Sequence, residues 1–225
     1  WGKCERKPAL TGAGLGMVVE KPVLRDRVSL QTAMAQLGGS SVFLPVKEAG
    51  LGSRESLPDF ARIMSQYVDA VVLRTFAHAT VVTFAEYASC PVINGLSDYY
   101  HPCQALGDLL TLQELYETIR GRTVVFVGDG NNVARSLAVG CGKLGVRFVL
   151  SAPKGYGFDQ PFLEAFRHDL PNAEMQEICD PTQAVRKADA DTLIVADGTS
   201  CRHQIHDGSG RDALHVARLL AMSLA

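Results

Sequence analysis

Short apolar runs of strand length alternate with helical patterns along the chain, and this alternation constrains the fold more than any other feature. The apolar runs lie at residues 15–20, 41–45, 69–74, 91–94, 123–128, 147–151, 174–178 and 191–197. Helical spacing of apolar residues occurs at residues 28–37, 56–67, 82–87, 102–118, 132–144, 161–168, 181–187 and 212–224. Strands that alternate with helices form parallel sheets covered on both faces. The sequence therefore predicts an α/β protein with two doubly wound parallel-sheet domains, residues 1–118 and 119–225.

The composition is that of an ordinary globular chain. Of the 225 residues, 47% are hydrophobic and 20% are charged, with a net charge of −2. This balance gives no reason to expect nucleic acid or an anionic membrane as a partner. No apolar run approaches the roughly 20 residues that cross a bilayer. The six cysteines include no C-x-x-C pair, and the first residues lack a signal-peptide pattern, so we expect reduced thiols and a cytoplasmic location.

A candidate site lies where the apolar run at residues 91–94 leads through a polar loop into the helix at 102–118. Pro102 suits the first turn of a helix, and His101 and Gln104 are three residues apart, so they can share one helix face. An imidazole, a carboxamide and free helix N–H groups can together bind a carbonyl oxygen or an oxyanion. An ordinary helix start with a solvated histidine is the alternative.

Four sequence blocks lie in a fixed order: RTFAHAT at residues 74–80, NGLSD at 94–98, HPCQ at 101–104 and GDGNNVARSL at 128–137. Together they resemble the signature of the aspartate/ornithine carbamoyltransferases, and of their ornithine branch in particular. The resemblance extends from about residue 7 to about residue 190. It implies a carbamoyl-phosphate-binding domain at residues 1–118 and an ornithine-binding-type domain at 119–225, the second truncated and with an atypical tail.

The resemblance also implies a reaction, in which the carbamoyl group of carbamoyl phosphate passes to the amine of ornithine and gives citrulline and phosphate. Such a step belongs to arginine biosynthesis, and it needs no cofactor and no metal. The implied catalytic residues are His101, Gln104 and Arg74. The family works as a trimer in which a neighbouring subunit completes the site, so a homo-oligomer is implied as well.

Four further residues are implied as substrate-binding, namely Arg25 and Arg27 in the phosphate loop and Asn131 and Asn132 at a helix start. The motif at residues 128–132 begins like a dinucleotide fingerprint, but Val133 replaces its third glycine and no acidic residue closes the next strand. A nucleotide role therefore has little support.

The phosphate loop departs from the family pattern Ser-x-Arg-Thr-Arg, because residues 23–27 are VLRDR. Val23 lacks the hydroxyl, and Asp26 places a negative charge beside a dianion. A like charge at about 4 Å costs on the order of 4 kcal/mol at an effective dielectric constant near 20. We therefore expect phosphate binding to be impaired, and a merely surface-charged loop is the alternative.

The tail, from about residue 184 to residue 225, resembles the C-terminal end of FAD-linked, iron–sulfur-associated oxidoreductases. The Ser-Met-Gly and His-Cys-Leu-Pro segments of the carbamoyltransferases do not occur there. Three functions therefore stay open: impaired carbamoyl transfer, a catalytically degenerate member that keeps binding or oligomerisation, and a fragment of an FAD-linked oxidoreductase.

Overall fold

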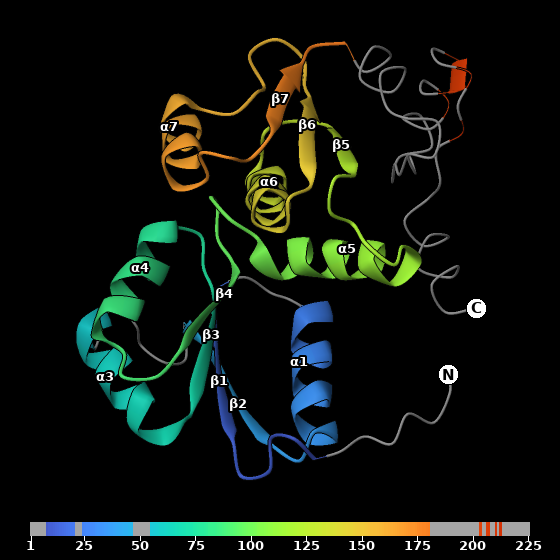
Figure 1. Cartoon of the computed structure of the whole chain (residues 1–225). Helices are drawn as coiled ribbons and strands as arrows, with labels where there is room; N and C mark the ends of the chain where they lie inside the picture. Colours follow the sequence, from blue (N-terminus) through green and yellow to red (C-terminus); the bar gives the residue numbers. More distant parts are fainter. Residues whose placement is uncertain are drawn as a thin grey trace. The chain divides into compact units, whose positions relative to one another are not determined.

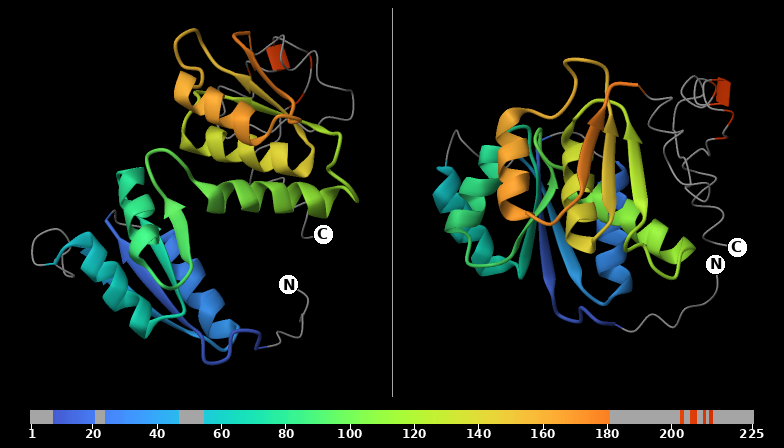
Figure 2. Two further views of the ribbon diagram at one scale, coloured as in Figure 1. Left: turned by 60° about the vertical axis from the view of Figure 1, so that its left-hand side comes forward. Right: turned by 45° about the horizontal axis from the view of Figure 1, so that its top comes forward.

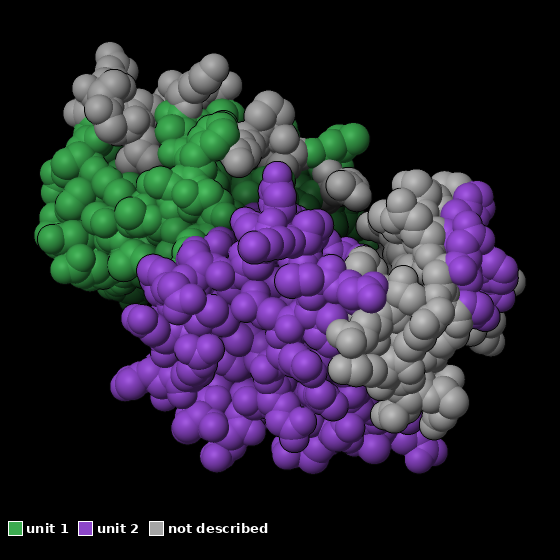
Figure 3. All heavy atoms as spheres, turned by 90° about the horizontal axis from the view of Figure 1, so that it is seen from above, with its two compact units in different colours: residues 1–103 green, residues 104–225 purple. Residues whose placement is uncertain are grey.

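The computed structural model describes residues 8–20, 24–46 and 55–180, together with residues 203, 206, 207, 210 and 212, and for residue 25 it describes the backbone alone. The chain divides into two compact units, residues 1–103 (unit 1) and residues 104–225 (unit 2), which Figure 3 colours separately. The predicted domain boundary at residues 118/119 stays a prediction. The compact units divide earlier, at the start of the helix that follows Pro102.

Unit 1 is built on a four-stranded parallel sheet of order β2-β1-β3-β4 (Figure 1). Its elements are β1 (Gly14–Val19), α1 (Arg25–Gln36), β2 (Ser40–Pro45), α3 (Leu57–Tyr67), β3 (Ala70–Arg74), α4 (His78–Tyr87) and β4 (Val92–Leu96). Because successive side chains of a strand point to opposite faces, each strand supplies both cores. Val18, Val71 and Leu73 pack with residues of α3 and α4. Leu15, Met17 and Val72 pack with Met34 of α1 on the other face.

The helix α5 (Pro102–Leu115) begins at the end of unit 1 and continues into unit 2. The rest of unit 2 consists of β5 (Thr123–Val127), α6 (Asn132–Leu144), β6 (Arg147–Ser151), α7 (Gln160–Asp169) and β7 (Met175–Ile178). Its three described strands pair in parallel in the order β5-β6-β7. The helices α6 and α7 lie side by side (Figure 2), so close that a Cβ at Gly142 would lie 3.4 Å from Phe166 Cζ.

The predicted fold class is confirmed, since both described sheets are parallel and helices alternate with strands from β1 to β7. Two helices begin earlier than the apolar spacing predicted. α1 begins at Arg25 rather than at Val28, after Leu24, which makes no side-chain cap. α4 begins at His78 rather than near residue 82, because the Asp98 carboxylate accepts a hydrogen bond from the His78 backbone N–H at 2.8 Å.

The predicted elements at residues 181–187, 191–197 and 212–224 lie outside the described residues, apart from Asp212. Within the part of the chain that the structure describes, no helix has the length and apolar character that a membrane span requires.

Candidate active site

Arg74 is the last residue of β3, at the carboxyl edge of the sheet in unit 1, where open α/β sheets bind their ligands. A bulge sets its position. Leu73 pairs with Asn94, but Arg74 pairs with Leu96, so Gly95 is the extra residue of β4. A Cβ at Gly95 would lie 2.9 Å from Val72 Cγ1 and 3.1 Å from the Leu73 carbonyl oxygen. Glycine at this position therefore lets the two strands approach each other just before the site.

The Arg74 guanidinium forms an ion pair with Asp26 in the first turn of α1, through Nη1 and a carboxylate oxygen. The Arg74 side chain is 18% exposed and that of Asp26 is 38% exposed, so the pair is shielded from solvent on the arginine side. Arg74 Nε is buried and has no hydrogen-bond partner among the described residues. One carboxylate therefore leaves part of the guanidinium able to donate to a further acceptor.

His101 lies half-buried within reach of the same charges. Burial lowers the pKa of His101 from its ordinary value of 6.5, the positive charge of Arg74 lowers it further, and the Asp26 carboxylate acts in the opposite direction. The imidazole is consequently neutral at pH 7, and a neutral imidazole has one N–H donor. The combination of a guanidinium and a neutral imidazole suits an anion with a carbonyl group nearby.

The loop after β3 and the loop after β4, which lie beside this cluster, are joined by hydrogen bonds. The Ser97 hydroxyl lies 3.0 Å from His78 Nδ1, and the Tyr100 backbone N–H donates to Ser97 Oγ at 3.1 Å. The Asp98 backbone N–H donates to the Phe76 carbonyl oxygen at 2.8 Å. The shape of the loop that leads to His101 thus depends on the residues directly after Arg74. Burial is also the main reason that the pKa of His78 is lowered, with Asp98 opposing it.

The other predicted site residues of the first half are placed differently. Arg27 is exposed, and its guanidinium carbon lies 3.9 Å from the ring centre of Phe43 in β2. Gln104, the first residue of unit 2, is exposed and its side-chain amide donates to Asp108 at 2.8 Å. The side chain of Arg25 and all of Val23 lie outside the described residues. The substrate-binding roles of Arg25 and Arg27 and the catalytic role of Gln104 stay predictions.

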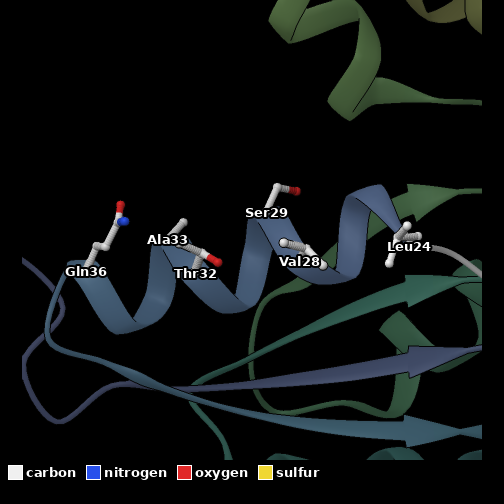
Figure 4. Close-up of a pocket in the computed structure, with 6 residues that line it drawn as sticks. All are labelled: Leu24, Val28, Ser29, Thr32, Ala33 and Gln36. Atoms are coloured by element: carbon white, nitrogen blue, oxygen red, sulfur yellow. The ribbon is translucent and has the colours of Figure 1, made fainter. Parts of the chain in front are cut away.

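An open hollow runs along the face of α1 that points away from the sheet (Figure 4). It is lined by Leu24, Val28, Ser29, Thr32, Ala33 and Gln36. None of these side chains carries a charge, so the hollow lacks a cationic group such as the Arg74 guanidinium at the strand edge.

In unit 2 the loop after β5 is held by its own structure. Asn131 caps α6, and its side-chain oxygen accepts from the Val133 and Ala134 backbone N–H groups at 3.0 Å each. Its amide nitrogen donates to Asp129 at 2.9 Å. The predicted role of Asn131 in substrate binding would therefore compete with its role as a helix cap. Asn132, the first residue of α6, is partly buried, and its role stays a prediction.

A second contact fixes the loop after β6 to α6. Arg135 pairs with Asp159 at 2.7 Å, and Asp159 also caps α7 by accepting from the Phe162 backbone N–H at 2.8 Å. Gly130 donates to the Tyr156 carbonyl oxygen at 2.7 Å. Hydrogen bonds and an ion pair thus connect the loops after β5 and β6 with each other and with α6 and α7.

Sequence reasoning predicted Arg74 and His101 as site residues but missed that Asp26 pairs with Arg74. It treated the Asp26 carboxylate as a charge beside a ligand, whereas the structure makes it a partner of the arginine. The available signal was the position of both residues after strands of one parallel sheet, because such loops meet at the same edge.

Two family models match the chain. Residues 2–114 match the carbamoyl-P binding domain of aspartate/ornithine carbamoyltransferase, and residues 120–201 match the Asp/Orn binding domain. With two parallel α/β units and a guanidinium–imidazole cluster at a strand edge, these matches define the class. The chain belongs to the aspartate/ornithine carbamoyltransferase family.

Its relatives include ornithine carbamoyltransferases. That of Bacillus subtilis (strain 168) is 45% identical over 185 residues, which cover 81% of this chain and 58% of the relative. The solved structure of the Pyrococcus furiosus ornithine carbamoyltransferase has a TM-score of 0.78 and 40% identity, and covers 91% of this chain and 65% of that one. A solved N-acetyl-L-ornithine transcarbamylase has a TM-score of 0.71 at 27% identity, covering 81% and 64%. The chain thus spans about three fifths of the length of its curated Bacillus relative.

Proposed function

We propose that this chain binds carbamoyl phosphate in unit 1 and takes part in transfer of the carbamoyl group to the side-chain amine of ornithine, giving citrulline and phosphate. The observation that carries the proposal is the cluster of Arg74 and His101, two chemically complementary groups from separate loops of one sheet edge. The family membership supports the same chemistry.

In the proposed reaction each group has one task. Arg74 binds the phosphate group, because a planar guanidinium donates two parallel hydrogen bonds to an oxyanion. Neutral His101 donates its N–H to the carbonyl oxygen and stabilises the negative charge that develops on it, with Gln104 as a second donor. The neutral amine then attacks the carbonyl carbon, and phosphate leaves from the tetrahedral intermediate. Catalysis consists of positioning and electrostatics, without a covalent nucleophile or a cofactor.

Unit 2 supplies the amino-acid side of the proposed reaction. Asn131 and Asn132 are the proposed contacts, and the Asn131 side chain also caps α6. A homo-oligomer, of three subunits as in the family, and a cytoplasmic location complete the proposal. Light scattering coupled to gel filtration tests the oligomer.

A second function has one observation in its favour. The Asp26–Arg74 ion pair places a carboxylate on the arginine that should bind phosphate, as expected of a degenerate member that keeps the fold and its subunit contacts. The third candidate, an FAD-linked module, rests on the tail, which lies almost wholly outside the described residues. Flavin absorbance of the purified protein tests it.

Calorimetric titration with carbamoyl phosphate is the decisive measurement, followed by an assay of citrulline formation. Saturable binding with citrulline formation supports carbamoyl transfer. Saturable binding without citrulline supports the degenerate member. If carbamoyl phosphate does not bind, or if it binds Arg74→Gln as tightly as the unchanged chain, the proposed site is wrong. Arg62→Gln is the matched control, because Arg62 forms an exposed ion pair with Asp59 in α3 of the same unit.

A further inference from the structure

The ion pair between Asp26 and Arg74 joins two segments that are 48 residues apart in sequence. Asp26 lies in the first turn of α1, and Arg74 ends β3. The other described arginine pair of unit 1, Arg62 with Asp59, lies within one helix turn and has both side chains more than half exposed. The Asp26–Arg74 pair is therefore the more strongly shielded of the two, and its charge is screened less by solvent.

The Asp26 carboxylate accepts hydrogen bonds from only part of the Arg74 guanidinium. It contacts Nη1, whereas Nε is buried without a partner among the described residues. A guanidinium binds a phosphate or a carboxylate best when two of its N–H groups donate in parallel. Arg74 is thus an anion-binding group that is partly occupied by an anion of its own chain, and it keeps a donor for a second one.

We propose that Asp26 is an internal competitor for the anion site of Arg74, so that a phosphate group binds there only by displacing this carboxylate or against its repulsion. The proposal rests on the proposed function in one respect, which is the choice of a phosphate-bearing ligand. Asp26 then determines how strongly the site discriminates against doubly charged ligands, because repulsion from a fixed carboxylate grows with the charge of the ligand.

Charge removal at residue 26 tests the proposal. Binding of inorganic phosphate is measured by calorimetry for the unchanged chain, for Asp26→Asn, which keeps the shape of the side chain, and for Asp26→Thr. We expect both variants to bind phosphate at least about tenfold more tightly, a lower bound because the full repulsion corresponds to about three decades before screening. The gain should vanish in the double variant Asp26→Asn/Arg74→Gln.

Asp59→Asn is the matched control. It also removes one negative charge and one arginine pair from the first turn of a helix in unit 1, but at an exposed position, so phosphate affinity should not change. A gain of the same size in this control would show that net charge alone is responsible and would overturn the proposal.

Unchanged or weaker phosphate binding by both Asp26 variants would also overturn the proposal, because Asp26 would then only hold Arg74 in place. The same conclusion would follow if circular dichroism showed both variants to be unfolded, since the pair would then be a structural requirement. Citrulline formation separates this inference from the proposed function. If the Asp26 variants bind phosphate more tightly but no variant forms citrulline, Asp26 is a competitor for the anion site and the proposed carbamoyl transfer is wrong. If the unchanged chain forms citrulline but the Asp26 variants bind phosphate no more tightly, the proposed function is right and the competitor role of Asp26 is wrong.

Discussion

The carboxyl edges of the two sheets use their polar side chains in opposite ways. In unit 1 the edge gathers Arg74, Asp26 and His101, and part of the arginine has no partner among the described residues. In unit 2 the edge is tied by the cap of Asn131 and by the ion pair of Arg135 with Asp159, in which the arginine side chain is 14% exposed. Parallel α/β topology places loops together at one edge in both units, but in unit 2 the edge residues Asn131 and Asp159 also cap helices, whereas α1 and α4 of unit 1 have no side-chain cap.

The difference teaches that topology locates a site, whereas the hydrogen-bond balance decides whether the site can take a ligand. A buried donor without a partner costs free energy, and an arriving ligand recovers it. Polar groups that cap helices, as Asn131 and Asp159 do in unit 2, contribute to stability.

The largest expected effect on ligand binding comes from removing the Arg74 guanidinium at the sheet edge of unit 1. Arg74→Gln should weaken binding of carbamoyl phosphate about 100-fold, because a charge-assisted bidentate contact is lost, a change of about 2.7 kcal/mol. Calorimetric titration measures it, with Arg62→Gln as the control that should bind like the unchanged chain. Equal affinities for Arg74→Gln and the unchanged chain would remove the contrast between the two edges.

The next effect tests the bulge that positions Arg74. Gly95→Ala should lower the free energy of unfolding by about 2 kcal/mol, because the new Cβ meets Val72 Cγ1 and the Leu73 carbonyl oxygen at distances that force a shift. Urea denaturation measures the loss. Gly107→Ala is the control, since a Cβ at Gly107 meets nothing within 4 Å. If Gly95→Ala were as stable as the control, the tight approach of β3 and β4 would not be real.

A smaller effect belongs to unit 2. Asn131→Ala removes the cap of α6 and should cost about 1 kcal/mol of stability, the usual value of an N-cap. Urea denaturation measures this loss, and phosphate binding in unit 1 should stay unchanged. A variant that kept full stability would show that Asn131 is available for a substrate, and the two edges would then resemble each other.

The smallest effect is the pH dependence due to His101. The pKa of His101 in the folded state lies below its ordinary value of 6.5. At a pH between the folded pKa and 6.5, the unfolded chain therefore binds more protons than the folded chain, and the free energy of unfolding rises with pH. This contribution is fully present above pH 6.5 and is lost as the pH falls through the folded pKa. NMR titration of the ring protons, with the urea-unfolded chain as reference, measures both values. A folded midpoint at or above the unfolded one would contradict the burial of His101 beside Arg74.

Local sequence patterns predicted the strands and helices well where a strong local signal exists. The helix predicted from residue 56 is α3, and the Ser56 hydroxyl caps it by accepting from the Asp59 backbone N–H at 3.3 Å. The starts of α1 and α4 were placed too late, because neither helix has a side-chain cap that the sequence could reveal. The start of α4 depends on Asp98, which is 20 residues away in sequence.

For the site, the amino-acid sequence by itself determined which chemical groups are present and near which strand ends they lie: Arg74 at the end of one strand, His101 after another, and Asp26 close to the start of a helix. Only the tertiary structure decided that the Asp26 carboxylate rests on Arg74, that Arg74 Nε is left without a described partner, and that Arg27 turns to Phe43 instead. The physical reason is that these pairings depend on distances between segments remote in sequence. The sheet register and its bulge set such distances, whereas a local pattern carries no information about them.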